Sequence, residues 1–471
     1  MSSSAQAGAS PERGIEQHSI EPIPAEERHG SVASLFTIWF GSNMQLTTIV
    51  TGALATVLGL SLQRALLAIL LGNAFGAVFM ALHSAQGPKL GIPQMIQSRA
   101  QFGFYGACVP IALVLLMYLG YFASSAVLGG ETLAAAWGLG FTQATLILSV
   151  VTALLSIYGY RAIHRLDRYF SAAAAVAFLY LSVRLLNGHD LAGAWHAGST
   201  SFGLFLLVVS ISATWQITYA PYVADYSRYL PETTSIRAAF WWTYAGSVLA
   251  CVWMMWLGAI AAATARAGFS HDSSSFLVNL AAQRVRWSII LVIAVGIVAA
   301  NVLNLYGMFM SVATTISSIR PVRVTRRLRA VWIGVLALLG TLVAILGQGN
   351  FITNFENFIL FLAYFLIPWT AINLADFYVV RKERYDIRSI FNPNGIYGRL
   401  NWRTLCAYAV AVLAEIPFVK TSFYTGGAVA SVGGADIAWI VGLILATLLY
   451  ILLMRAEARQ ARAALLGSAE S

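Results

Sequence analysis

Aromatic and amide side chains gather in a stretch that should otherwise lie inside a membrane. The apolar run SFGLFLLVVSI continues into Trp215, Gln216, Thr218 and Tyr219, and Pro221 follows at once. A proline removes a backbone donor and clashes with the preceding turn, so the sequence predicts a break or kink there. In hydrocarbon, freed backbone groups are tolerated where they face protein or a water-filled cavity. An indole and an amide beside a broken helix indicate a substrate site in a transporter, and a proline kink that only packs is the alternative.

A second interruption lies in the first apolar segment, five segments earlier. There Gly41, Ser42, Asn43 and Gln45 interrupt the run FGSNMQLTT. Interrupted segments at corresponding positions of two halves are typical of an inverted repeat with substrate bound between them. The amides of Asn43 and Gln45 have donors and acceptors for the edge of a flat heterocycle, and interhelical hydrogen bonding is their alternative role. Gly41 favours an unwound backbone whose carbonyls could bind a cation.

Two further segments carry pairs of side chains with helical spacing. Tyr118 and Tyr121 lie three residues apart in the third segment, and so do Asn301 and Asn304 in the eighth. Each pair therefore shares one helix face. Aromatic faces suit stacking on a planar base, although packing against a neighbouring helix is the common role. Buried amides must find partners, and the position of the asparagines away from the helix ends favours a ligand.

Charged groups at the segment ends are assigned to gating or structure. Asp225 and Arg228 form a local acid–base pair after the sixth segment, and Asp376 lies close to Arg381 after the tenth. The residues assigned to gating or structure are Pro221, Asp225, Arg228 and Asp376. The sequence leaves open which group, if any, carries a proton; the candidates are His83, Glu356, Asp376 and Glu415.

The composition predicts a membrane protein. Of the 471 residues, 59% are hydrophobic and 10% are charged, whereas a soluble chain has about 25% charged residues. Continuous apolar runs of about 20 residues predict an all-α, polytopic integral membrane protein and not a β-barrel. We count twelve segments: 33–60, 64–84, 105–130, 142–160, 168–187, 201–222, 238–264, 287–317, 329–348, 356–379, 403–419 and 436–454.

These segments divide the chain into four parts. The parts are a polar N-terminal tail (1–32), a ten-helix core (33–379, in halves 33–187 and 201–379), a loop with two more helices (380–454) and a C-terminal tail (455–471). Counting loops alternately places 23 of the 29 lysines and arginines on the side of the N-terminus. The positive-inside rule then predicts that both termini are cytoplasmic in a multi-pass protein of the plasma (inner) membrane.

The remaining motifs exclude several classes of protein. The basic run PVRVTRRLR is a topology signal, so no nucleic-acid partner is expected despite the net charge of +10. The cysteines Cys108, Cys251 and Cys406 have neither disulfide nor zinc-site spacing. No phosphate-binding loop or catalytic constellation is visible, so we expect no enzyme, no ATP-driven pump and no cofactor. Nothing in the sequence indicates an obligatory protein partner.

Four stretches carry a resemblance to a known family. They are EERHGSVASLFTIWFGSNMQ, HSAQGPKLGIPQMIQSRAQFG, APYVADYSRYLP and IPWTAINLADFYVVRKERYDI. Over about residues 20–455 the chain resembles the nucleobase:cation symporter family, purine/cytosine permease branch. The resemblance implies twelve transmembrane helices in a LeuT-like five-plus-five inverted repeat, with helices 1 and 6 broken, and transport by alternating access. It also implies substrate contacts at Gln45, at Trp215 or Gln216, at Tyr118 or Tyr121, and at Asn301 and Asn304.

The expected activity is import of cytosine or a purine by cation symport. Allantoin, hydantoin, uracil or a hydroxymethylpyrimidine are alternative substrates, and a channel or receptor-like protein on the same scaffold is an alternative class. In sodium-coupled members of the family, helix-1 carbonyls and helix-8 hydroxyls hold the ion. Here Ala299 and Ala300 precede Asn301, so only the carbonyls near Gly41 and Met44 remain. A hard cation needs several oxygen ligands, so we expect proton coupling in preference to sodium coupling.

Overall fold

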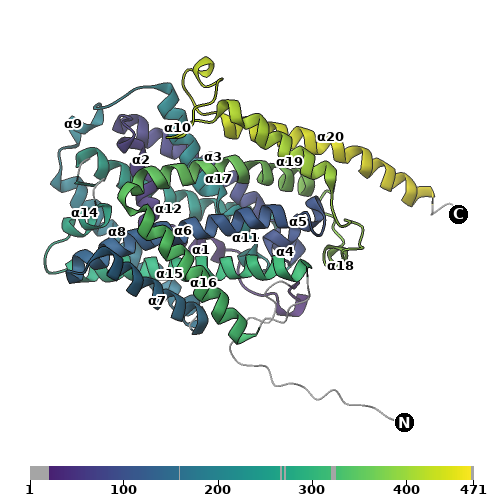
Figure 1. Cartoon of the computed structure of the whole chain (residues 1–471), viewed down its shortest axis with the longest axis horizontal. Helices are drawn as coiled ribbons and strands as arrows, with labels where there is room; N and C mark the ends of the chain where they lie inside the picture. Colours follow the sequence, from purple (N-terminus) through teal and green to yellow (C-terminus); the bar gives the residue numbers. More distant parts are fainter. Residues whose placement is uncertain (1–20, 159, 266–267, 270–271, 320–324, 468–471) are drawn as a thin grey trace, which may run out of the picture.

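The computed structural model describes residues 21–158, 160–265, 268–269, 272–319 and 325–467. In these residues the chain is helical and has no β-strand, only two isolated bridges, Leu60 with Ser199 and Lys420 with Thr425. Figure 1 shows long helices packed side by side, with α20 extending past the others at one side of the view. The all-helical class expected from the sequence is confirmed.

The first half of the chain contains a broken helix followed by four long ones. The broken helix is α1 and α2, and a short 3₁₀ turn, Ala25–Glu27, precedes it. Its interruption is the stretch 43–45, where Gln45 is extended (φ −138°, ψ 157°). The helices are α1 (Ser34–Ser42), α2 (Leu46–Val57), α3 (Leu62–Ser84), α4 (Gly87–Leu90), α5 (Gln94–Phe102), α6 (Cys108–Trp137), α7 (Phe141–Tyr158) and α8 (Tyr160–Gly188).

The second half repeats this pattern. The helices are α9 (Leu191–Trp195), α10 (Phe202–Ile217), α11 (Ala220–Ser227), α12 (Ile236–Thr264), α14 (Ser273–Leu280), α15 (Arg286–Ile319), α16 (Arg326–Gly347) and α17 (Phe351–Leu374). A 3₁₀ turn, Gln348–Asn350, joins α16 to α17, and a π-helical turn, Ala375–Val380, ends α17. The break between α10 and α11 falls at Thr218 and Tyr219, just before Pro221. The proline thus lies in the first turn of α11, where its missing N–H costs nothing.

The C-terminal part covers one side of this core. It contains α18 (Ile387–Ile390), α19 (Trp402–Glu415), 3₁₀ turns at Ile416–Phe418 and Ala430–Val432, and α20 (Ala438–Gly467). Both α19 and α20 pack on α17. The proposed division of the chain into tails, core and C-terminal helices stays a prediction.

Glycines bring four helices of the core into close contact. A Cβ added at Gly76 of α3 would overlap the backbone of Ala213 in α10, and one at Gly258 of α12 would overlap the backbone of Ile49 in α2. Lipid tails are as apolar as leucine, so membrane helices associate largely through such close backbone packing. Tyr244 of α12 also donates to the carbonyl of Ala74 in α3. We call α2, α3, α10 and α12 the glycine-packed group.

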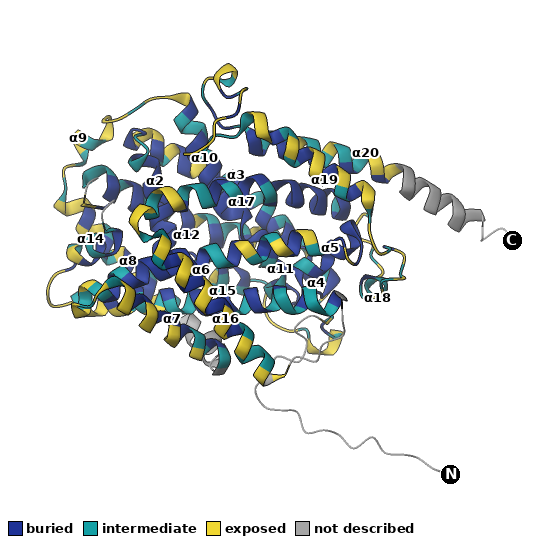
Figure 2. Ribbon diagram, viewed as in Figure 1, coloured by how far each residue is buried: buried dark blue, intermediate teal, exposed yellow. Residues whose placement is uncertain are grey.

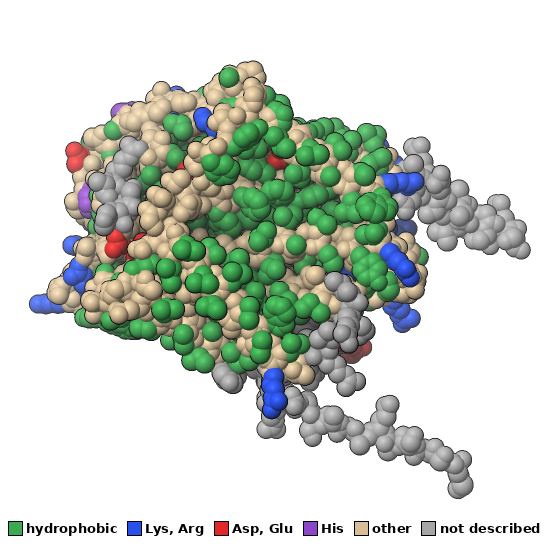
Figure 3. Space-filling model, viewed as in Figure 1, with side chains coloured by type: hydrophobic (Ala, Val, Ile, Leu, Met, Phe, Trp, Pro, Cys, Tyr) green, Lys and Arg blue, Asp and Glu red, His purple; other side chains and the backbone are tan. Residues whose placement is uncertain are grey.

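The surface agrees with a membrane environment. Figure 2 shows exposed residues along the outer faces of α7, α16 and α20 and buried residues on the inner helices. In Figure 3 hydrophobic side chains cover the middle of the visible face, and lysines and arginines lie toward its edges. By length and composition, eight helical stretches of the described residues could cross a membrane, one of which, Arg327–Val380, contains both α16 and α17. Two shorter apolar helices accompany them, and the count of twelve spans stays a prediction.

Candidate substrate-binding cavity

A cavity of about 490 Å³ lies where the two broken helices meet α6 and α15. The first broken helix, α1–α2, corresponds to the predicted helix 1, and the second, α10–α11, to the predicted helix 6. The cavity wall includes the interrupted backbone of helix 1 at Gly41–Ser42 and Met44–Gln45, and the break of helix 6 at Thr218 and Tyr219. The volume falls within the range of about 300–1,000 Å³ typical of small-molecule sites. From the breaks the cavity extends along α11 as far as Asp225 and Arg228.

Aromatic rings form a substantial part of the cavity wall. The ring of Tyr121 stands edge-on to the indole of Trp215, with centroids 5.6 Å apart, and Tyr118 lies 5.5 Å from Tyr222. The hydroxyl of Tyr121 pairs with that of Thr218 at 2.9 Å. Such pairs hold the rings in fixed orientations, so the cavity presents preorganised faces to a planar ligand.

The amides predicted for this site take different positions. Gln45 and Asn304 line the cavity. The amide nitrogen of Asn304 donates to Asn301 Oδ1 at 3.2 Å, and that of Asn301 donates to the carbonyl of Phe122 at 3.1 Å. Asn301 itself is buried behind Asn304 and does not line the cavity. The geometry therefore presents Asn304 to a ligand and supports it with Asn301.

Asn43 and Gln216 lie behind the cavity wall. Gln216 donates to Asn73 Oδ1 at 2.9 Å and accepts from the hydroxyl of Ser247 at 2.6 Å. Neither Gln216 nor Asn43 lines the cavity. Of the two neighbouring residues Trp215 and Gln216, Trp215 is the one that faces the cavity.

The side-chain oxygen of Asn43 collects three donors. It accepts from the indole N–H of Trp215 at 3.0 Å, the hydroxyl of Tyr219 at 2.7 Å and the thiol of Cys251 at 2.9 Å. The amide nitrogen of Asn43 donates to the carbonyl of Trp39 at 2.8 Å. The helix-1 break thus fixes two aromatic rings of the helix-6 break.

Comparison with known proteins places this architecture in a family. The model of the family described as permeases for cytosine/purines, uracil, thiamine and allantoin matches residues 22–442. The chain belongs to this permease family. It is 45% identical over 441 residues to YxlA of Bacillus subtilis, a purine-cytosine permease by name, covering 94% of this chain and 96% of that one. It is 28% identical over 469 residues to the purine-cytosine permease fcyB of Emericella nidulans, covering 94% and 89%.

Solved structures show the same fold. The inward-facing conformation of Mhp1 has a TM-score of 0.77 at 21% identity, and covers 96% of each chain. A closed conformation of Mhp1, a nucleobase-cation-symport-1 family transporter, with bromovinylhydantoin bound, has a TM-score of 0.74 at 19% identity and covers 95% of this chain and 96% of that one. The expected fold, with broken helices 1 and 6, is thereby confirmed for this permease.

The residues near a possible cation site offer few hydroxyls. Gly41, Met44, Ala299 and Ala300 all line the cavity of the permease. The two alanines have no side-chain oxygen. The hydroxyl of Ser42, which also lines the cavity, donates to the carbonyl of Ile38, and the hydroxyl of Ser171 lies beside Gly41. In the described part of the chain, no three or more His, Cys, Asp and Glu side chains are grouped to hold a metal ion.

Asp225 and Arg228 lie where the cavity extends along α11. A carboxylate oxygen of Asp225 accepts from the backbone N–H of Gln94 at 2.7 Å, and Arg228 Nε donates to the Asp225 carbonyl at 3.3 Å. The guanidinium also lies 5.1 Å from the ring centroid of Tyr229. This part of α11 is therefore tied to α5, and a gating role for the pair stays a prediction.

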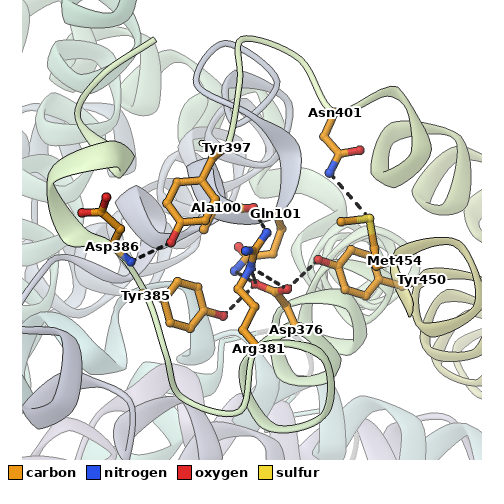
Figure 4. Close-up of polar contacts among 10 residues, drawn as sticks. All are labelled: Ala100, Gln101, Asp376, Arg381, Tyr385, Asp386, Tyr397, Asn401, Tyr450 and Met454. Carbon is orange, nitrogen blue, oxygen red and sulfur yellow. Dashed lines mark hydrogen bonds and ion pairs between the residues drawn. The ribbon is translucent and has the colours of Figure 1, made fainter. Parts of the chain in front are cut away.

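Asp376 lies away from the cavity, in the π-helical turn at the end of α17. Figure 4 shows its carboxylate among side chains from α5, α20 and the following loop. It accepts from Gln101 at 2.8 Å, Tyr385 at 2.7 Å, Tyr450 at 2.7 Å and Arg381 Nε at 3.0 Å. Burial raises the pKa of Tyr385, and the adjacent carboxylate of Asp376 raises it further, so this phenol stays protonated and donates. The arrangement fits a structural role for Asp376.

Several aromatic cavity residues were not assigned to substrate binding from the sequence. Trp39, Tyr219, Tyr222 and Tyr226 all line the cavity. The last three are spaced by three and four residues, so they share one helix face. This spacing is present in the sequence, but the helix breaks at Thr218 and Tyr219, so the face that these tyrosines share could not be oriented from the helix before the break.

Proposed function

We propose that this permease is a secondary active transporter that imports a nucleobase, cytosine or a purine, by proton symport. The single observation that carries the proposal is the cavity at the two helix breaks, where aromatic rings stand beside an amide edge. Trp215 and Tyr121 offer faces for stacking, worth about 1–3 kcal/mol per base. Gln45 and Asn304 offer donors and acceptors for the edge of the base.

The names of relatives support this substrate class. YxlA and fcyB are named as purine-cytosine permeases, and the solved complex of Mhp1 holds bromovinylhydantoin, a planar heterocycle. The alanines at 299 and 300 support the choice of proton over sodium, because they provide no side-chain oxygen ligand. With both termini on the cytoplasmic side of the plasma membrane, Asp225 and Arg228 lie toward the cytoplasm, and the cavity extends from the breaks to that side.

The first experiment is a thermal-shift screen of the purified permease against nucleobases and related heterocycles. A ligand that binds the native state raises the apparent melting temperature by mass action. We expect shifts with cytosine or a purine, followed by uphill uptake of the same compound into proteoliposomes under an inward proton gradient. Shifts only with allantoin, a hydantoin, uracil or a pyrimidine vitamin would replace the substrate proposed here. Flux only down a gradient would replace the transporter by a channel.

A further inference from the structure

Glu415 is a buried acid that the cavity does not use. It ends α19 and is 1% exposed. Neither of its carboxylate oxygens has a hydrogen-bond partner in the described part of the chain. The other buried acids of this region are fully partnered: Asp376 by four side chains, and Asp436 by the hydroxyl of Tyr364 and the backbone N–H groups of Lys420 and Ala438. Glu415 therefore differs from Asp376 and Asp436 in having no hydrogen-bond donor for its carboxyl oxygens.

The carboxyl group of Glu415 occupies a space built from three helices. A Cβ added at Gly442 of α20 would overlap Oε1 of Glu415 and lie 3.1 Å from the ring of Pro368 in α17. The glycine thus leaves room that the carboxyl fills. Pro368 lies inside α17 and removes the N–H that would bond to the carbonyl of Tyr364, so this part of α17 contains an acceptor without its helical donor. We call this space the Glu415 seat.

The groups that face the seat do not supply a positive charge. Tyr364 from α17, Tyr408 from α19 and Asp436 before α20 interact electrostatically with Glu415. Tyr364 donates to Asp436, and Tyr408 donates to the carbonyl of Phe365 at 3.0 Å. Nearby Lys420 directs its ammonium group to the carbonyl of Gly434 at 2.9 Å. An ionised carboxylate in this seat would have neither a donor nor a cation, beside a second acid.

We propose that Glu415 takes up and releases the coupling proton of the transport cycle, and that it is a neutral carboxylic acid when α17, α19 and α20 pack as seen here. This inference rests on the proposed function, since it names the proton site of that symport. Release is a simple acid dissociation: the O–H bond of the carboxyl group breaks, the proton passes to water and a carboxylate remains.

One helix connects the seat to the cavity. The ring of Phe358 in α17 stands edge-on to the cavity residue Tyr121, with centroids 5.2 Å apart. Pro368 lies ten residues further along the same helix, roughly 15 Å away at 1.5 Å per residue. A movement of α17 that changes the cavity wall therefore also changes the packing over Gly442. Opening of the seat admits water, which allows the proton to leave.

Infrared spectroscopy tests the protonation state without any substrate. We expect the wild-type permease at neutral pH to show a carboxylic-acid C=O band that is missing in Glu415→Gln. Glu232→Gln, which changes an exposed acid in the same way, should leave the band in place. Identical spectra of wild type and Glu415→Gln would overturn the inference.

Transport in proteoliposomes tests the coupling. Each coupled proton drives up to about tenfold accumulation across a gradient of one pH unit. We expect Glu415→Gln to lose this accumulation while it still binds the base and exchanges it across the membrane, and Glu232→Gln to accumulate like the wild type. Gly442→Ala, which fills the seat but keeps the acid, should reduce proton-driven accumulation in the same way, so the test does not depend on one variant.

The outcomes separate the two proposals. If Glu415→Gln and Gly442→Ala both accumulate the base like the wild type, the inference is overturned and the proposed function stands. If the wild type itself shows no proton-driven uptake, the proposed function fails. The transport role of Glu415 then fails with it, whatever the infrared spectra show.

Discussion

The side-chain oxygen of Asn43 lies 3.0 Å from the indole nitrogen of Trp215 and accepts a hydrogen bond from its N–H group. This bond joins the interruption of helix 1 to the last turn before the interruption of helix 6. The same oxygen accepts from Tyr219 at 2.7 Å. The aromatic faces of the cavity are therefore held by a residue that does not line it.

Replacing Asn43 by Ala should weaken substrate binding through misplaced rings. The substitution leaves the buried N–H of Trp215 and the hydroxyl of Tyr219 without their acceptor, at a cost of about 1–3 kcal/mol for each unpaired group. We expect a lower melting temperature and a weaker affinity for the base. Asn187→Ala changes an exposed asparagine near the end of α8 and should leave both unchanged. Unchanged affinity in Asn43→Ala would show that the rings hold their positions without it.

Replacing Trp215 by Ala should remove a stacking face from the cavity. Loss of about 1–3 kcal/mol of stacking corresponds to an affinity reduced roughly 5- to 150-fold. Trp215→Phe keeps an aromatic face but loses the N–H donor, so it should lie between Trp215→Ala and the wild type. Isothermal titration calorimetry with the base found in the screen measures all three affinities. Trp241→Ala, at a tryptophan that is 61% exposed, is the control; a Trp215→Ala variant that binds like this control would mean that the site is elsewhere.

Sodium should not be required for uptake. Ala299 and Ala300 have no side-chain oxygen to add to the helix-1 carbonyls, and a hard cation needs several oxygen ligands. We expect the initial rate of base uptake under an inward proton gradient to be the same in sodium and in choline buffers. A protonophore should abolish accumulation in both. Strict dependence of uptake on sodium would contradict the proposed coupling ion.

Replacing Gly442 by Ala should destabilise the permease mainly while Glu415 is present. The added methyl group overlaps the carboxyl oxygen, and such overpacking costs about 1–3 kcal/mol. In a Glu415→Ala background the space is empty, so the second substitution should cost much less. The difference is a coupling free energy between contacting residues, measurable as a double-mutant cycle of unfolding free energies. Additive effects of the two substitutions would mean that the carboxyl does not occupy this space.

Replacing Asp376 by Asn should destabilise the end of α17 without affecting the cavity directly. The change leaves Arg381, whose side chain is 22% exposed, without its ion-pair partner, at a cost of roughly 3 kcal/mol. The melting temperature should fall, and the affinity of the remaining folded protein for the base should stay the same. Glu383→Gln, at an exposed acid seven residues along the chain, is the matched control. A normal melting temperature in Asp376→Asn would show that the pair is dispensable.

The sequence predicted the helix breaks because their causes are local. Gly41 and Pro221 mark both interruptions, and the structure places the breaks at 43–45 and 218–219. Asn43 and Gln216 could not be placed in the same way. Which side of a broken helix faces the cavity depends on the turn at the break and on α12, whose Ser247 bonds both amides.

The burial of a side chain by segments that are distant in sequence also could not be predicted from local patterns. Glu415 is one of the proton-carrying candidates named from the sequence, but α20 and α17 cover it to 1% exposure, and no pattern near residue 415 predicts this burial. Glycine and proline at 442 and 368 prepare its surroundings, and no local pattern relates those positions to residue 415. In contrast, the acid–base pair of Asp376 and Arg381 is local, and the sequence placed it correctly at the end of α17.

The glycine-packed group has a consequence for inhibitor design. Close backbone contacts join α2, α3, α10 and α12, so we expect these four helices to move together. The glycines of α6 and α15 instead lie against side chains of α6, α7, α8, α15 and α17. A compound that fills the cavity and extends between these two sets of helices holds them at a fixed separation. Such a compound binds but is not transported. The length of a substituent on the heterocyclic ring should therefore decide whether an analogue is a substrate or an inhibitor.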